Sequence, residues 1–267
     1  MAHPHWRTRH RRTVKQEKNM SYPSNKIIAG TFVAMYVSFF NGSSAEAEGL
    51  TETQYILNTF SFLVHGFLVM FMAAGFAMLE SGLVRSKNTA TICLKNIALY
   101  SIAGLMFYLI GYNLMYLEVD GGYFGGFQMW SGNNTDALAG KFDAAYAAES
   151  DWFFQMVFVA TAASIVSGTL AERIKLWPFL AFVVVLAAII YPIQGSWQWG
   201  GGWLSEAGFS DFAGSTLVHS VGGWAALCGA LVLGARKGKY QPDGSIQPIP
   251  GANLPLATLG TFILWLG

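Results

Sequence analysis

Residues 211–236, which read DFAGSTLVHSVGGWAALCGALVLGAR, decide the fold. Their interior is apolar or small for long enough to cross a bilayer as a helix. The segment nevertheless carries Asp211 at its start and His219 in its middle, and ionisable side chains inside a membrane are costly unless they have a partner or a function. Asp211, Ser215, His219 and Gly223 are spaced four apart, so we expect them on one helical face. That face should meet protein or water and not lipid.

The composition of the whole chain points to a membrane protein. Of its 267 residues, 53% are hydrophobic and only 12% are charged, and the mean hydropathy is +0.39. This profile is typical of an all-α, polytopic transmembrane helix bundle and not of a soluble enzyme of this length. A net charge of +1 gives no reason to expect a nucleic-acid partner.

The sequence contains no recognisable pattern of catalytic or metal-binding residues. It lacks paired carboxylates, a nucleophile elbow, a phosphate-binding loop and metal-spaced ligands, so we expect neither an enzyme nor a bound cofactor or metal. Cys93 and Cys228 both fall within apolar segments, which argues against a disulfide framework. We interpret both as small core residues.

The N-terminal region has the layout of a signal peptide. A basic block at residues 1–19 precedes an apolar run at 27–40 and an Ala-Glu-Ala cleavage site at 45–47. This order favours a cleaved secretory signal over a first spanning helix. Translation can start at Met1 or at Met20, and the second choice would make the basic block an upstream extension.

The rest of the chain, residues 48–267, is predicted to be a partial membrane domain that follows the extension and signal of residues 1–47. Five apolar segments lie at about 55–78, 92–116, 152–170, 176–193 and 213–233. A sixth, at 254–267, has about 14 residues, fewer than the roughly 20 that a spanning helix needs. The sequence therefore looks like an incomplete copy.

Basic residues alternate between the loops and predict the orientation. Loops that carry Lys and Arg face the cytoplasm by the positive-inside rule. Three loops carry them, at Arg85 and Lys87, at Arg173 and Lys175, and at Arg236, Lys237 and Lys239. The loops between, 117–151 and 195–212, are mainly acidic. We therefore expect a multi-pass protein of the cell (inner or plasma) membrane whose mature N-terminus lies outside.

Candidate binding residues lie near the predicted outer surface. Trp197, Trp199 and Trp203 surround three glycines just before Asp211. They form either an interfacial aromatic belt or a site at which an indole face holds a small cation, an attraction of about 1–2 kcal/mol. Asp211 is either a helix N-cap or a group that sets the electric field at an entrance, and the two roles are compatible.

The third and fifth apolar segments supply the remaining candidates. Phe154 and Phe158 are four apart and share a helical face, either as core residues or as a hydrophobic constriction that excludes hydrated ions. Gln155 beside them either bonds a neighbouring helix or lines the entrance. The His219 imidazole either bonds a neighbouring backbone or accepts a hydrogen bond from a passing solute and relays protons.

Four runs of sequence carry a resemblance to a known family. They are FMAAGFAMLESGLVRSKN at 71–88, FFQMVFVATAASIVSGTLAERIK at 153–175, WQWGGGWL at 197–204 and the segment 211–236. Over about residues 55–267 the chain resembles the ammonium transporter (Amt/Mep/Rh) family. The resemblance implies eleven transmembrane helices in two inverted halves, usually assembled as a trimer with one pore per subunit. This chain would then hold the N-terminal half, the first five helices and the start of the sixth.

The resemblance also assigns roles to individual residues. Trp199 resembles the aromatic residue that binds ammonium at the outer site, and Asp211 resembles the acidic residue that shapes that site. Phe158 matches a gate phenylalanine, Phe154 lies one turn above it, and Gln155 is similar to a position near this gate.

His219 matches the first of two pore histidines, which implies a mechanism. Ammonium would be captured, lose its water at the phenyl gate and lose a proton, and ammonia would pass along the pore. A bare cation in a low dielectric is costly whereas neutral ammonia is not, which agrees with this order of events. Because the second gate Phe, the second pore His and the inverted half are missing from the sequence, we expect this chain alone to conduct nothing.

An ammonium sensor or signalling receptor with the same fold is the alternative function. The resemblance further implies ammonium or ammonia as substrate, the lipid bilayer as environment and a homotrimer when complete. It also implies a PII-type regulator at the cytoplasmic face, where Arg236, Lys237 and Lys239 would be available.

Overall fold

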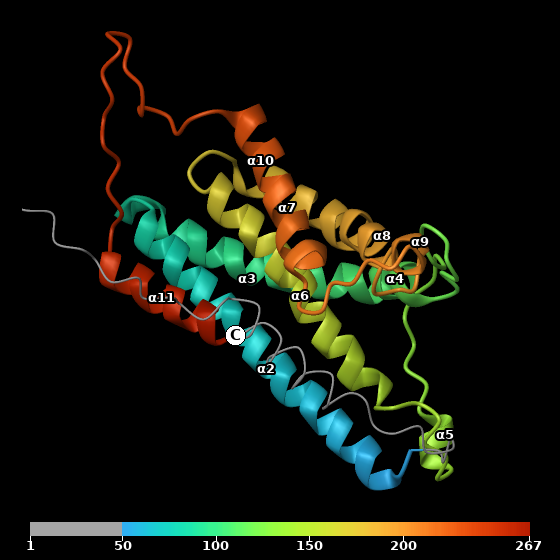
Figure 1. Ribbon diagram of the computed structural model, residues 1–267. Coiled ribbons are helices and arrows are strands. Elements are labelled where there is room, and N and C mark those ends of the chain that lie inside the picture. The colour runs from blue at the N-terminus through green and yellow to red at the C-terminus, as the bar shows by residue number, and fades with distance from the viewer. Residues whose placement is uncertain (1–49) are drawn as a thin grey trace, which may run out of the picture. The chain divides into compact units, whose positions relative to one another are not determined.

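The computed structural model describes residues 50–267 (Figure 1). The predicted signal peptide and the alternative start Met20 lie outside the described residues. The helices in chain order are α2 Glu52–Leu83, α3 Thr89–Met106, α4 Tyr112–Tyr116, α5 Thr135–Leu138, α6 Ala148–Leu170, α7 Leu176–Val185, α8 Tyr191–Ser196, α9 Trp203–Glu206, α10 Val221–Leu233 and α11 Leu254–Leu266. One isolated bridge, Tyr240–Ile246, is the only β pairing in this part of the chain. The predicted all-α helix bundle is confirmed.

Three of the long helical spans contain a π-helical turn. The turns are η2 Phe107–Gly111 between α3 and α4, η3 Leu186–Ile190 between α7 and α8, and η4 Ser215–Ser220 before α10. With these turns included, five spans within residues 50–267 are long and apolar enough to cross a bilayer. The shorter apolar helix α11 has 13 residues.

The first span is longer than the apolar segment 55–78 from which it was predicted. It begins at Glu52 because Thr51 and Gln54 form a capping box, in which each side chain binds the backbone of the other. It continues to Leu83 because the polar residues Glu80 and Ser81 are buried within the bundle. The hydropathy of the sequence alone does not show where this helix begins or ends.

Helix α6 is the centre of the bundle and packs against α2, α3 and α10. Its middle is made of small residues that are buried on all sides, including Ala162 and Ala163. The hydroxyls of Thr161 and Ser164 donate to carbonyls one turn earlier in the same helix, at 2.8 and 2.9 Å. These bonds satisfy the polar groups without partners from other helices, so neighbouring helices can approach α6 closely.

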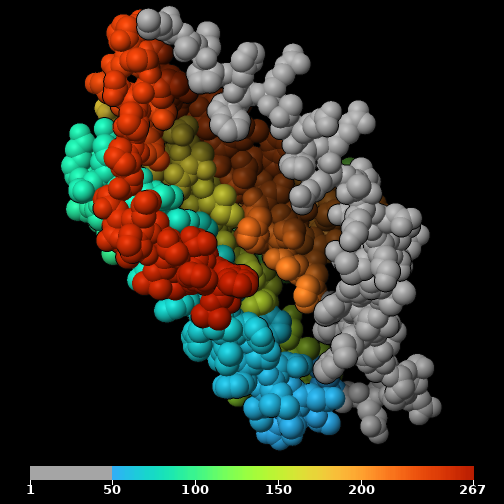
Figure 2. All heavy atoms as spheres, turned by 60° about the vertical axis from the view of Figure 1, so that its left-hand side comes forward, coloured from blue at the N-terminus to red at the C-terminus, as the bar shows by residue number. Residues whose placement is uncertain are grey.

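Glycines allow α11 to pack directly along α2 (Figures 1 and 2). A Cβ atom on Gly260 would lie 2.5 Å from the backbone nitrogen of Leu79 and 2.6 Å from the carbonyl oxygen of Gly75. A Cβ on Gly82 would lie 2.5 Å from the carbonyl of Asn253. No side chain fits in these gaps, so the two backbones are in contact.

The interpretation of the two cysteines as core residues is wrong. Cys93 and Cys228 are both exposed, on α3 and α10. A membrane helix can be apolar on every side, so an apolar neighbourhood in the sequence does not distinguish a buried position from one on the outer surface of the bundle.

One ion pair is enclosed between α2, α3 and α6. The Lys95 ammonium lies 3.0 Å from Oε2 of Glu80, and the two side chains are 5% and 2% exposed. Ser167 donates its hydroxyl to the same oxygen at 2.8 Å, and Lys95 donates to the Ser167 carbonyl at 2.8 Å. The two charges neutralise each other, which offsets the cost of burying them, and the pair connects three helices.

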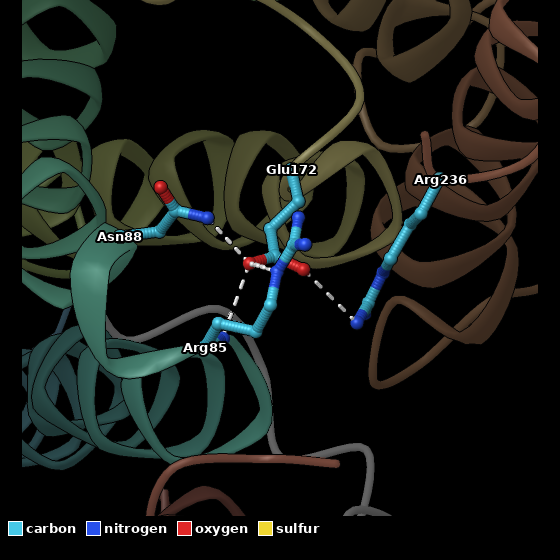
Figure 3. A network of polar contacts seen from close by, with 4 residues as sticks. All are labelled: Arg85, Asn88, Glu172 and Arg236. Carbon is cyan, nitrogen blue, oxygen red and sulfur yellow. Dashed lines mark hydrogen bonds and ion pairs between the residues drawn. The ribbon is translucent and has the colours of Figure 1, made fainter. Parts of the chain in front are cut away.

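Glu172 joins the loops at the end of the bundle that carries most of the basic residues, which we call the basic end (Figure 3). Its Oε1 accepts from the Asn88 amide and from the backbone and Nε of Arg85, at 3.1 and 3.0 Å. Its Oε2 accepts from Arg236 at 3.3 Å, and the Glu172 side chain is 1% exposed. Burial alone would raise the Glu172 pKa, but these hydrogen bonds and the Arg85 charge hold it below its usual range.

Candidate functional site

A cavity of about 700 Å³ opens at the other end of the bundle, beside α4 and α6. Four of the six residues predicted for the site line it, namely Phe154, Gln155, Phe158 and Trp199. The other two, Asp211 and His219, are not in its wall.

The aromatic residues of the cavity form a chain of edge-to-face contacts. The rings of Phe154 and Phe158 lie 5.0 Å apart at 87°, because residues four apart on α6 project to the same side. Phe158 in turn lies 6.0 Å from Trp199 at 65°. Each contact of this kind contributes about 0.5–1.5 kcal/mol beyond its buried area, so this aromatic part of the wall is apolar and is stabilised by its own ring contacts.

Trp199 is positioned by the turn that follows α8 and by one hydrogen bond. Gly201 has a φ of +75°, which glycine adopts without strain and which lets the chain reverse after the tryptophan. The indole Nε1 donates to the backbone carbonyl of Asp211 at 2.6 Å. The carbonyl of Asp211 therefore fixes the indole at the cavity wall.

The carboxylate of Asp211 caps the fifth span and does not face the cavity. Its two oxygens accept four backbone N–H groups, from residues 214 to 217, at 2.8–3.1 Å. The helix begins only at Ser215, after Gly214 with a φ of +81°. The expected single helical face from Asp211 to Gly223 is therefore wrong, because Asp211 precedes the helix and a π-helical turn changes the spacing.

His219 lies in η4 and is exposed within the described part of the chain. Its Nδ1 lies 3.1 Å from the carbonyl oxygen of Gly214. A carbonyl oxygen only accepts, so Nδ1 is the donor, and in a neutral imidazole Nε2 is then the acceptor. The imidazole is thus held in one tautomer with its acceptor nitrogen available.

A carboxylate that was not predicted from the sequence also lines the cavity. Asp151, which is 7% exposed, lies in the first turn of α6. The Tyr112 hydroxyl donates to its Oδ2, and the Gln155 amide donates to its Oδ1 at 3.3 Å. Its position four residues before Gln155 was the available signal, since that spacing places both on one face of α6.

Two oxygens in this cavity are buried and have no hydrogen-bond partner among residues 50–267. They are the hydroxyl of Tyr116 and Oε1 of Gln155. Burial raises the pKa of Tyr146, which also lines the cavity, and the negative charge of Asp151 raises it further. A carboxylate, unpaired oxygens and aromatic faces together suit a small cation that donates hydrogen bonds.

Comparison with known proteins identifies the family. The model of the Ammonium Transporter Family matches residues 60–267. The chain belongs to this family. It is 43% identical, over 90% of its length and 52% of the relative's, to the ammonium transporter Amt2 of Archaeoglobus fulgidus. Among solved structures, it matches a sensor Amt protein at 41% identity with a TM-score of 0.72, over 80% of this chain and 53% of that one.

The fold extends to more distant members of the family. The chain matches the crystal structure of Candida albicans Mep2 at 24% identity with a TM-score of 0.66, over 80% of this chain and 47% of that one. The predicted resemblance to the ammonium transporter family is confirmed, and the chain is a multi-pass membrane protein. It spans about half the length of the curated relatives it matches.

Proposed function

We propose that the chain takes part in ammonium transport and that the 700 Å³ cavity is where ammonium is recruited. The observation that carries this proposal is the combination of Trp199 and Phe158 with a buried carboxylate, Asp151, in one cavity wall. Membership of the ammonium transporter family supports the choice of ligand.

Recruitment would rest on Asp151 and on the aromatic faces. A small cation that leaves water needs replacement acceptors, which the Asp151 carboxylate and Oε1 of Gln155 supply. The faces of Trp199 and Phe158 add a cation-π attraction of about 1–2 kcal/mol. Asp211 contributes indirectly, because its carbonyl holds the Trp199 indole.

Passage beyond the cavity would use Phe158, Phe154 and His219. The two phenyl rings form an apolar constriction at which the cation gives up its remaining water. Transfer of one proton from ammonium to the Asp151 carboxylate or to water in the cavity leaves neutral ammonia to move onward, because an unpaired ion is costly in a low dielectric. The free Nε2 of His219 then accepts a hydrogen bond from ammonia or carries a proton.

The proposed location is the cell membrane, with the basic end toward the cytoplasm. Arg85, Lys87, Arg173 and Lys175 support this orientation through the positive-inside rule. The ammonium cavity then opens to the outside, and the mature N-terminus lies outside.

Assembly and regulation are further parts of the proposal. Many large apolar side chains are exposed on the described helices, including Trp224 and Leu231 on α10. They need lipid or other protein around them, which supports a homotrimer in the bilayer. Arg236, Lys237 and Lys239 at the basic end are available to a PII-type regulator.

A sensor is the second candidate function. It is favoured by the likeness to a structure titled a sensor Amt protein, at 41% identity. In a sensor, ammonium binding at the cavity would change the conformation of the basic end. Hydrogen exchange with and without ammonium separates the two functions: protection limited to α4 and α6 favours transport, and altered exchange in loop 171–175 favours sensing.

Titration of the purified chain with ammonium chloride, followed by tryptophan fluorescence, tests the recruitment site. We expect a saturable response that potassium chloride does not reproduce at equal concentration. Trp199→Leu should weaken binding by about tenfold, the equivalent of about 1.4 kcal/mol of cation-π attraction. Trp177→Leu is the matched control, because Trp177 is 78% exposed on α7 and is absent from the cavity wall.

Two outcomes would count against the recruitment site. One is an identical response to potassium. The other is unchanged ammonium affinity in Trp199→Leu, measured calorimetrically so that the lost indole does not affect the signal.

A further inference from the structure

The loops of the basic end enclose a second cavity, of about 380 Å³. It lies where the chain enters α3 and where it passes from α6 to α7. Of its lining residues, one is acidic, Glu172, and the basic ones are Arg85, Lys87, Lys95, Arg173, Lys175 and Lys237. The wall is therefore strongly positive.

The positive charge of this cavity is largely unneutralised. Glu172 already shares its two oxygens between Arg85, Asn88 and Arg236 (Figure 3). In contrast, the side chains of Lys87, Lys175 and Lys237 make no ion pair or hydrogen bond with any residue in 50–267. Three ammonium groups from three different loops thus line one concavity.

Arg173, in the same wall, has a buried nitrogen without an acceptor in residues 50–267. The Nη1 of Arg173 donates to the carbonyl of Gly234 at 3.2 Å, but its Nε is buried and has no partner among the described residues. A buried charged donor left without an acceptor is costly. An anion bound beside Arg173 would supply an acceptor of the kind that this nitrogen needs.

The start of α7 adds donors of the same kind. Lys175 is the N-cap of this ten-residue helix and makes no side-chain capping bond. The free N–H groups and the positive end of the helix dipole favour negative charge at this point. The positive-inside rule explains why the loops are basic, but not the gathering of these donors around one cavity.

We propose that this cavity binds a phosphate group with net negative charge. The phosphate comes from the headgroup of an anionic phospholipid or from a soluble phosphate, and both present the oxygens that Arg and Lys recognise. The apolar side chains of Ile92, Leu170 and Ile174 share the wall, and the exposed Trp177 beside it is typical of a membrane interface. These neighbours suit a lipid headgroup with its chains in the bilayer.

Thermal unfolding of the purified chain in a neutral detergent tests the site with three probes. They are short-chain phosphatidylglycerol, short-chain phosphatidylcholine and inorganic phosphate. Phosphatidylglycerol should raise the melting temperature saturably and phosphatidylcholine should not. A response to phosphatidylglycerol alone identifies a lipid site, and a response to inorganic phosphate identifies a site open to soluble phosphates.

Matched lysine variants connect the binding to this cavity. Lys87→Gln combined with Lys237→Gln should weaken the apparent affinity by about tenfold, because two charge-assisted contacts are lost. Lys239→Gln removes the same charge two residues away, outside the cavity wall, and should change the affinity less than twofold, about the noise of such a titration. Without a probe, all variants should melt like the parent chain, because Lys87 and Lys237 are exposed and Lys239 is only half-buried.

Three results would overturn the proposal. They are the absence of binding by phosphatidylglycerol and by inorganic phosphate, equal binding of phosphatidylcholine, and equal loss of affinity in Lys239→Gln. Ammonium binding at the opposite end of the bundle is measured separately, so failure here leaves that function untouched.

Discussion

The indole Nε1 of Trp199 donates to the backbone carbonyl of Asp211, 2.6 Å away, while the carboxylate of Asp211 accepts four backbone N–H groups. One buried residue thus fixes both the tryptophan at the cavity wall and the first turn of the helix that carries His219. Asp211 therefore holds two neighbouring elements in place, and the carboxylate that lines the cavity is that of Asp151.

Asp211→Asn should lower the free energy of unfolding by about 2 kcal/mol. An amide nitrogen does not accept hydrogen bonds, so two backbone N–H groups lose their partner and the remaining two lose the negative charge. Thermal unfolding in detergent measures the stability, and hydrogen exchange should accelerate at residues 214–217. Asp243→Asn is the control, because Asp243 lies in an exposed turn and accepts from Ser245. Equal losses in the two variants would contradict the capping role.

Asp151→Asn should weaken ammonium binding by about tenfold. The change keeps the size of the side chain but removes the negative charge from the cavity, and one charged hydrogen bond in such a site contributes about 1.5–3 kcal/mol. Calorimetric titration with ammonium chloride measures the effect. Asp143→Asn removes an exposed carboxylate outside the cavity and should leave the affinity unchanged. A similar loss of ammonium affinity in both variants would mean that the overall negative charge of the acidic loop, and not Asp151 itself, attracts ammonium.

The sequence predicted the parts of the site that depend on local spacing. Phe154, Phe158 and Gln155 lie on one turn of a regular helix, so their common cavity follows from the period of 3.6 residues. Asp151 was missed because it was grouped with the acidic residues of loop 117–151. Helix α6 in fact begins at Ala148 and includes it.

Features that depend on irregular backbone or on distant partners were not predictable. His219 could not be placed by counting in fours, because η4 is a π-helical turn with a wider period. Glu80, Lys95 and Ser167 come from three different spans, so no local sequence pattern predicts their contact. Burial of Cys93 was wrongly predicted for a related reason, since apolar residues cover both faces of a membrane helix.

Lys95→Met should destabilise the chain by about 3–5 kcal/mol. The substitution leaves the Glu80 carboxylate buried without its positively charged partner, and an uncompensated buried charge is costly. Glu80→Gln combined with Lys95→Met should recover most of the loss, because no charge then remains. Thermal unfolding of the two single variants and the double variant gives the coupling energy. Additive losses would show that the two charges do not interact.

Gly260→Ala should separate α11 from α2. The added Cβ would lie within 2.6 Å of backbone atoms of Leu79 and Gly75, which do not move aside as a flexible side chain would. Limited proteolysis of the 234–253 connection should become faster as α11 detaches. Gly223→Ala is the control, because a Cβ there meets nothing within 4 Å. Unchanged proteolysis in Gly260→Ala would show that the helix contact is not tight.

The stability of the basic end should fall in acid through Glu172. Its pKa is held below the ordinary value of 4.5, because the hydrogen bonds from Asn88 and Arg85 outweigh the effect of burial. A carboxyl group with a lowered pKa contributes stability that is complete above the unfolded value and is lost as the pH falls through the folded value. The stabilisation should therefore be constant at neutral pH and decline below pH 4.5.

Glu172→Gln isolates this contribution, because it keeps the shape of the side chain but does not titrate. The parent chain should melt at a higher temperature than the variant at neutral pH, and the difference should shrink as the pH falls below 4.5. Thermal unfolding of both proteins across this range measures it. A difference that stays constant down to about pH 3 would mean that the interactions of Glu172 with Arg85 and Arg236 do not depend on its charge.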